Sequence, residues 1–265
     1  MSEAKRANVF DHPLSAAIYD TAEGSREDLD HYVAIVEELG ARSVIDVGCG
    51  TGVLAIRLAG RGCWVTGVDP AGPMLDVARG KEGAEQVRWV HGTAEALPGL
   101  APDTGSSGGQ GSDRPEGQPS GIPADLAVMT GNVAQVFLAE EDWLATLRAV
   151  HGALVPGGHL VFETRIPERR AWEEWSDRGS SVYHVEGVGE VRDVFELVRV
   201  EEPYVTFSSD NTLPDGTVVP SESTLIFRSM PDLERTLAEA GFTVREVRDA
   251  PDRPGREWVV LAQRA

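Results

Sequence analysis

The stretch of sequence that decides the fold is Val44-Ile45-Asp46-Val47-Gly48-Cys49-Gly50-Thr51-Gly52. A short apolar run, Ser43–Val47, leads into three glycines at alternate positions, and Val53–Ala59 after them has the apolar spacing of a helix. The run therefore predicts a buried strand that turns sharply into a helix. A glycine-rich turn of this kind lets the backbone approach a ligand closely and directs the helix N-terminus at it, so we expect a nucleotide cofactor here.

Two features of the turn indicate which kind of cofactor it holds. The dinucleotide fingerprint has the spacing G-x-G-x-x-G, whereas this turn has G-x-G-x-G and carries Val53 where that fingerprint needs a glycine. Asp46 lies at the carboxyl end of the strand. A carboxylate there would repel a pyrophosphate but could accept hydrogen bonds from a methionyl ammonium group. The turn therefore favours a cofactor without phosphates.

Strands and helices alternate along the rest of the chain. Further apolar runs predict strands at Trp64–Val68, Val87–Val90, Ala124–Met129 and His159–Glu163. Helical spacing lies between them, around Met74–Ala78 and near Asp142–Leu154. This alternation predicts βαβ units and a parallel sheet.

Asp69 ends the predicted strand that begins at Trp64. An acidic residue at this place can accept hydrogen bonds from both hydroxyls of a ribose. The signal does not separate S-adenosylmethionine from NAD, but it argues against NADP, because the 2′-phosphate of NADP would face the carboxylate.

The end of the chain provides an independent criterion. Only Arg248–Glu257 joins the last two predicted strands, Phe242–Val247 and Trp258–Ala262, and this connection contains Pro251 and Pro254. A parallel crossover needs a dozen or more residues, usually with a helix. We therefore expect these two strands to be antiparallel neighbours, which is not the usual arrangement of an NAD-binding sheet.

Three segments lie outside this sheet within a single predicted domain, 1–265. Residues 1–40 are expected to form an N-terminal helical cover, because 14–40 has an amphipathic helical pattern that ends at Gly40. Residues 98–124 contain 16 Gly, Pro or Ser among 27 and predict a flexible loop. Residues 167–230 contain β-rich runs and a hairpin turn at Leu213–Thr217, so we expect an antiparallel β insertion after strand five.

The turn at 46–52, together with Asp69-Pro70-Ala-Gly-Pro-Met74 and residues 91–98, resembles class I S-adenosylmethionine-dependent methyltransferases, especially bacterial enzymes of small molecules. Residues 125–132 and 154–160 are similar to the family's fourth strand and to the turn before its fifth. The resemblance implies a Rossmann-like α/β sheet of seven strands in the order 3-2-1-4-5-7-6 with the last strand antiparallel. It also implies S-adenosylmethionine as the cofactor and methyl transfer to an O, N or C nucleophile.

The resemblance also implies positions for the adenine. Pro70 and Met74 would pack on the ring, and 91–98 would recognise its edge, although this chain has Thr93 where the family often has Asp. The residues expected to bind the cofactor are Tyr19, Asp46, Gly48, Cys49, Gly50, Gly52, Asp69, Pro70, Met74, Gly92, Thr93, Ala94, Glu95, Thr130 and Gly131.

Substrate and chemistry belong beyond the carboxyl ends of strands four and five. Glu163 is a candidate general base and Arg165 a candidate anchor for a substrate carboxylate, unless the two pair with each other or with helix ends. The residues expected to face the substrate are Tyr19, Asn132, Glu163, Arg165, Tyr183 and His184, of which Asn132, Glu163 and Arg165 are the catalytic candidates. A sulfonium is already a good leaving group, so positioning alone can supply most of the rate without a base.

Composition limits the remaining function classes. The 24 Lys and Arg against 43 Asp and Glu give a formal net charge of −19, which disfavours nucleic acid and anionic membranes. Two cysteines predict neither a disulfide framework nor a metal site, and we expect a cytoplasmic protein, monomeric or homodimeric. The alternatives are an NAD-dependent oxidoreductase and a regulatory protein that binds the cofactor without transferase activity.

Overall fold

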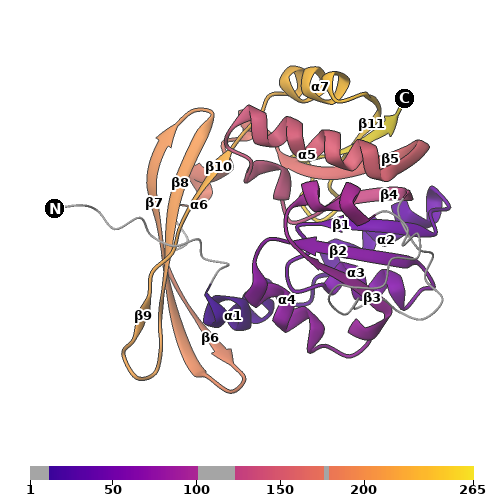
Figure 1. The fold of residues 1–265 in the computed structure, drawn as a ribbon. Coiled ribbons are helices and arrows are strands. Elements are labelled where there is room, and N and C mark those ends of the chain that lie inside the picture. Colours follow the sequence, from indigo (N-terminus) through magenta and orange to yellow (C-terminus); the bar gives the residue numbers. More distant parts are fainter. Residues whose placement is uncertain (1–11, 101–122, 176–178) are drawn as a thin grey trace.

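The computed structural model describes residues 12–100, 123–175 and 179–265. Its centre is a seven-stranded sheet in the order β11-β12-β5-β4-β1-β2-β3 (Figure 1). The strands are β1 (Ser43–Val47), β2 (Trp64–Asp69), β3 (Val87–His91), β4 (Ala124–Met129), β5 (Leu154–Arg165), β11 (Phe242–Asp249) and β12 (Glu257–Arg264). Strands β1 to β5 are parallel, and β12 is antiparallel to both β5 and β11. The strand order and the reversal expected from the sequence are confirmed.

Both faces of this sheet are covered, which explains why its strands are continuous apolar runs. On one face, Val44 of β1 belongs to a core with helices α2 (Asp30–Glu38), α3 (Val53–Ala59) and α4 (Gly72–Arg79). On the other face, Ile45 belongs to a core with α5 (Glu140–Ala153) and α7 (Met230–Glu239). Alternate residues of one strand thus anchor the two helical layers.

The helical pattern at 14–40 forms two helices instead of one. Helix α1 (Pro13–Glu23) ends before Gly24 and Arg26, which both have positive φ, and a 3-10 turn at Glu27–Leu29 then leads into α2. Only α2 joins the main core. Helix α1 leaves it and lies between α4 and the inserted sheet (Figure 1).

The insertion after β5 forms a second, antiparallel sheet in the order β10-β8-β7-β6, with β9 paired to β8. Its elements are α6 (Ala171–Trp175), β6 (Ser180–Val185), β7 (Gly189–Glu201), β8 (Tyr204–Thr212), β9 (Val218–Val219) and β10 (Glu222–Ile226). The predicted hairpin turn is present, because the Leu213 amide donates to the Thr217 carbonyl at 2.8 Å. The antiparallel insertion is confirmed. Strand β6 and helix α6 were not predicted from the sequence.

Most of the predicted loop at 98–124 lies outside the described residues. A 3-10 helix covers Ala94–Leu100, and β4 begins at Ala124. Residues 101–122 lie outside the described residues, so the flexibility of that segment stays a prediction. Among the residues that the structure describes, no helix is long and apolar enough to cross a membrane.

Candidate cofactor and substrate site

The glycine turn after β1 is shaped by backbone conformation and by packing. Gly48, Gly50 and Gly52 have φ values of +71°, +53° and +77°, which favour glycine. A Cβ on Gly48 would lie 2.6 Å from a methyl carbon of Val133, and one on Gly52 would lie 2.4 Å from the ring of Trp89. At Gly48 and Gly52 a side chain would therefore collide with neighbouring residues of the protein, in addition to the constraint from the backbone angles.

This turn forms one side of a pocket at the carboxyl ends of β1 and β4. The pocket is lined by Tyr19, Arg26, Leu29, Asp46, Gly48, Cys49, Gly50, Thr51, Val53, Leu54, Thr130 and Gly131. Seven residues expected at the cofactor thus meet in one place: Tyr19, Asp46, Gly48, Cys49, Gly50, Thr130 and Gly131. Burial and the neighbouring charges of Asp46 and Asp69 raise the pKa of the Cys49 thiol, so it stays neutral.

The most unusual group in the pocket is the Asp46 carboxylate. Asp46 is 1% exposed, and its Oδ1 has no hydrogen-bond partner among the described residues. Burial, with a further contribution from the charge of Asp69, raises the pKa of Asp46 to about 7, against the opposing effect of Arg26. A buried acceptor without a partner is costly, so this atom is suited to a ligand that donates a hydrogen bond.

Arg26 is a pocket residue that the sequence did not reveal. Its φ of 54° is rare for a residue with a side chain, and its Nε lies 3.1 Å from Oδ1 of Asp28. The side chain is 12% exposed. Arg26 stands outside the apolar stripe of its segment, and no pattern distinguishes it from the other arginines of the chain.

Asp69 connects the glycine turn to the start of α4. Its Oδ2 accepts from the Gly50 amide and its Oδ1 from the Ala71 amide, both at 2.8 Å. Asp69 does not line the pocket as the described residues form it; the same holds for Gly52, Pro70, Met74, Gly92, Thr93, Ala94 and Glu95. These eight residues follow β1, β2 or β3 at the same edge of the sheet, where β2 and β3 end with Asp69 paired to His91.

Met74 lies beside the glycine turn, where a Cβ built on Gly50 would be 3.6 Å from its methyl carbon, and its contact with adenine stays a prediction. It is 3% exposed and packs with Ala16 of α1 and Ala71, with Tyr19 partly buried against them. Helix α1 is also held by Asp20, which accepts from the Thr51 hydroxyl and lies 2.6 Å from Nζ of Lys81. The N-terminal helix is therefore attached directly to the glycine turn.

The two candidates at the end of β5 do not pair with each other. Glu163 accepts hydrogen bonds from the Tyr32 hydroxyl and from the amides of Gly131 and Asn132. Arg165 donates to Oε1 of Gln135 at 2.9 Å, lies 3.5 Å from a carboxylate oxygen of Glu257 and stacks over the ring of Trp175. Both side chains thus make well-defined contacts within the protein.

Asn132 is buried next to this group. It is 3% exposed, and its Nδ2 donates to Oε1 of Glu257 at 3.3 Å. Its Oδ1 and Oε2 of Glu257 have no partner among the described residues. Glu257 was not expected at the site, because its place beside Arg165 depends on the antiparallel pairing of β12 with β5.

Tyr183 and His184 are adjacent on β6 and cannot both face one ligand, because successive side chains of a strand point to opposite faces. Tyr183 is half-buried against Ile18 of α1, and His184 is exposed. Of these two substrate candidates, only Tyr183 is on the face that meets α1.

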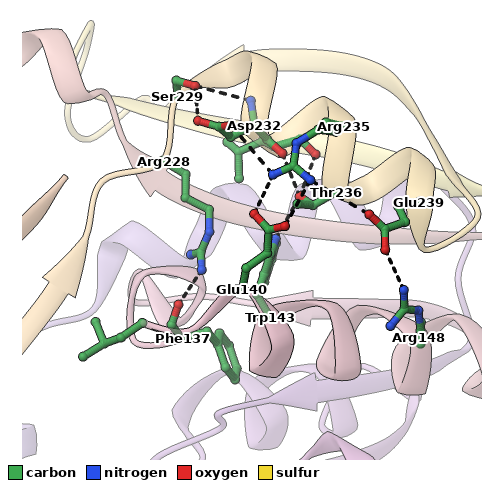
Figure 2. A network of polar contacts seen from close by, with 12 residues as sticks. Phe137, Glu140, Trp143, Arg148, Arg228, Ser229, Asp232, Arg235, Thr236 and Glu239 are labelled. Atoms are coloured by element: carbon green, nitrogen blue, oxygen red, sulfur yellow. Dashed lines mark hydrogen bonds and ion pairs between the residues drawn. The ribbon is translucent and has the colours of Figure 1, made fainter.

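The connection from β4 to α5, residues 130–139, is fixed from the insertion side. Arg228 follows β10, is 7% exposed and donates to the carbonyl of Ala134. It also donates to the carbonyl of Phe137 (Figure 2). Its guanidinium lies 5.1 Å from the centre of the Trp143 ring, and burial lowers the pKa of Arg228 to about 10. Figure 2 also shows Arg235 of α7 bound to Glu140 at the start of α5.

Gln135 completes this attachment. It is fully buried, accepts from Arg165 at the entry to the insertion, and donates to the Ile226 carbonyl at the exit.

Within the described residues, no group of three or more His, Cys, Asp or Glu side chains could hold a metal ion.

A seven-stranded sheet with a reversed strand β12, and a glycine turn that opens a pocket at its carboxyl edge, define the fold of class I methyltransferases. Residues 44–105 match the family model described as methyltransferase domain. An uncharacterized methyltransferase of Mycobacterium tuberculosis is 40% identical over 139 residues, which are 51% of this chain and 58% of that protein. Residues 44–105 thus form a methyltransferase domain, and the fold of the chain is that of the class I S-adenosylmethionine-dependent methyltransferases.

Solved structures resemble the whole chain in fold. The sugar N-methyltransferase KedS8 from Streptoalloteichus superimposes with a TM-score of 0.71 at 16% identity, covering 100% of this chain and 97% of that one. The S-adenosylmethionine-bound amino pentose methyltransferase CalS10 from Micromonospora echinaspora has a TM-score of 0.67 at 19% identity, with complete coverage of both chains. At these identities the likeness describes the fold.

Proposed function

We propose that the protein transfers the methyl group of S-adenosylmethionine to a small molecule. The observation that carries this proposal is the unpartnered Oδ1 of Asp46 in a pocket built from the glycine turn. A buried acceptor of negative charge suits the ammonium group of a methionyl moiety and is unsuited to a pyrophosphate. The alternative of an NAD-dependent oxidoreductase is therefore less well supported.

The other residues of the pocket fit the remaining parts of this cofactor. Arg26 is the cation among the described lining residues and would bind the methionyl carboxylate. Asp69 already holds the Gly50 and Ala71 amides, but each carboxylate oxygen can accept a second hydrogen bond, so it would also accept from the ribose hydroxyls. Tyr19 would cover the cofactor from α1.

The bound cofactor would supply a methyl group on a positively charged sulfur, which is already a good leaving group. The protein then needs to align the acceptor and exclude water. We propose that helix α1 and the insertion do so; Tyr19 of α1 lines the pocket, and Ile18 of α1 packs with Val185 and Val191 of the inserted sheet.

The substrate is proposed as a small molecule with an O, N or C acceptor. Two structural neighbours are a sugar N-methyltransferase and an amino pentose methyltransferase, and the net charge of −19 does not suit a nucleic acid. We propose a monomer or homodimer. A cofactor-binding regulatory protein would have the same pocket, and it would differ by binding the cofactor without turnover of any acceptor.

Native mass spectrometry of the freshly purified protein tests the cofactor. We expect S-adenosylmethionine or S-adenosylhomocysteine to be retained, or to bind when added. Retention of NAD would contradict the proposal. So would calorimetric titrations in which neither S-adenosylmethionine nor S-adenosylhomocysteine binds.

Ligand-dependent proteolysis tests the two covering segments. We expect S-adenosylhomocysteine to slow tryptic cleavage after Arg26, which closely follows α1, and after Arg192, which lies on β7 of the insertion. Cleavage after Arg245, which is exposed on β11, is the internal control and should not change. If the ligand changes the cleavage rate at none of the three positions, α1 and the insertion do not cover the site.

A further inference from the structure

The backbone that follows β4 adopts a conformation that needs support. Gly131 and the non-glycine residue Asn132 have φ values of +69° and +62°. For a residue with a side chain this conformation is unfavourable, and it persists only where the surroundings hold it. Thr130 and Gly131 also line the pocket. Whatever holds this turn therefore sets the position of one pocket wall.

Glu163 of β5 provides that support. Its Oε1 accepts from the Gly131 amide at 2.5 Å and from the Asn132 amide at 3.1 Å. The Tyr32 hydroxyl of α2 donates to the other carboxylate oxygen. Glu163 and Tyr32 are 5% and 1% exposed, and neither is among the described residues that line the pocket.

We propose that Glu163 and Tyr32 form a positioning pair that fixes the Thr130–Asn132 turn against the cofactor. This inference rests on the proposed function. Glu163 then acts through the backbone and is not a general base, although a carboxylate at the end of β5 predicts one. Its two oxygens already accept from two amides and a phenol, and Glu163 is not among the described residues that line the pocket.

The electrostatics of the pair agree with this role. Burial, together with the charge of Glu163, raises the pKa of the Tyr32 phenol, so the phenol remains a hydrogen-bond donor. Burial and the nearby charge of Glu257 raise the pKa of the Glu163 carboxyl, while the bonds from Tyr32 and Gly131 lower it. These bonds oppose the shift only in part, so the pKa of Glu163 stays raised, and its Oε1 can accept from the two amides in either protonation state.

Two substitutions of Glu163 separate positioning from base catalysis. Glu163→Gln keeps an oxygen that can accept from both amides but removes the basic carboxylate. Glu163→Ala removes the acceptor. We expect calorimetric affinity for S-adenosylhomocysteine to stay near the wild-type value in Glu163→Gln and to fall on the order of tenfold in Glu163→Ala, because the two amides lose their buried partner. If Glu163→Ala does not fold, Glu163→Asp, which withdraws the carboxylate by one methylene, takes its place.

A matched control distinguishes positioning from general instability. Val161→Ala shortens a fully buried side chain two residues earlier on β5, away from the turn. It should lower the melting temperature and leave the affinity unchanged. Wild-type affinity in Glu163→Ala or Glu163→Asp, or equal losses in Glu163→Gln and Glu163→Ala, would overturn the inference. Absence of binding by the wild-type protein would instead overturn the proposed function and this inference with it.

Discussion

Replacing Asp46 by asparagine is expected to stabilise the ligand-free protein at pH 8 and to weaken cofactor binding. Asp46 is fully buried with a pKa of about 7, whereas in the unfolded chain it would titrate near its ordinary value of 3.8. Between these values the folded state binds more protons, so stability falls as the pH rises through this window. The full cost of the buried charge is present above pH 7 and amounts to roughly 4 kcal/mol.

Urea unfolding at pH 8 and at pH 4 measures this effect. Asp46→Asn should raise the free energy of unfolding by about 2–4 kcal/mol at pH 8 and by much less at pH 4, where the wild-type carboxyl is already neutral. Asp76→Asn, an exposed position on α4, is the control and should show no such pH-dependent gain. An equal effect of Asp46→Asn at both pH values would show that the buried charge is not the cause.

The same substitution should weaken binding of S-adenosylhomocysteine by roughly tenfold or more at pH 8, because the ammonium group loses a charged partner. The protein thus retains a destabilising carboxylate whose proposed compensation is the ligand.

Asp69→Ala is expected to reduce cofactor affinity by about 2–4 kcal/mol, roughly 30- to 1,000-fold, because charge-assisted hydrogen bonds to the ribose are lost. The substitution also frees the Gly50 amide from its acceptor, so the glycine turn loses a contact that helps to fix it. Calorimetry with S-adenosylhomocysteine measures the loss. Asp69→Asn, which keeps one acceptor oxygen, should have an intermediate effect.

The control for Asp69→Ala is Asp76→Ala, whose carboxylate is exposed and pairs with Arg79 of the same helix. It should bind like the wild-type protein. Unchanged affinity in Asp69→Ala would remove the ribose contact from the model of the site, while leaving the pocket around Asp46 intact.

The central sheet could be predicted because its signals are local. The bounds of β1 and α3 follow from an apolar run, spaced glycines and helical periodicity, all within 17 residues of sequence. The reversal of β12 follows from the length of one connection. These features need no knowledge of distant contacts.

The substrate side could not be predicted in the same way, because its contacts join residues far apart in the chain. Tyr32 meets Glu163 across 131 positions, and Asn132 meets Glu257 across 125. A carboxylate at a strand end looks the same in sequence whether it faces a substrate or supports a turn. For Tyr183 and His184, the sequence contained no clear strand signal that would have assigned them to opposite faces.

The attachment of the insertion at Gln135 has a consequence for how such a protein can diversify. Entry through Arg165 and exit through Ile226 converge on one buried side chain. The two ends of the β-rich insertion are therefore both bound to one buried side chain of the central domain. Under the proposed function, changes between these two ends alter the acceptor side, and they reach the pocket around Asp46 through the packing of Ile18 of α1 against Val185 and Val191.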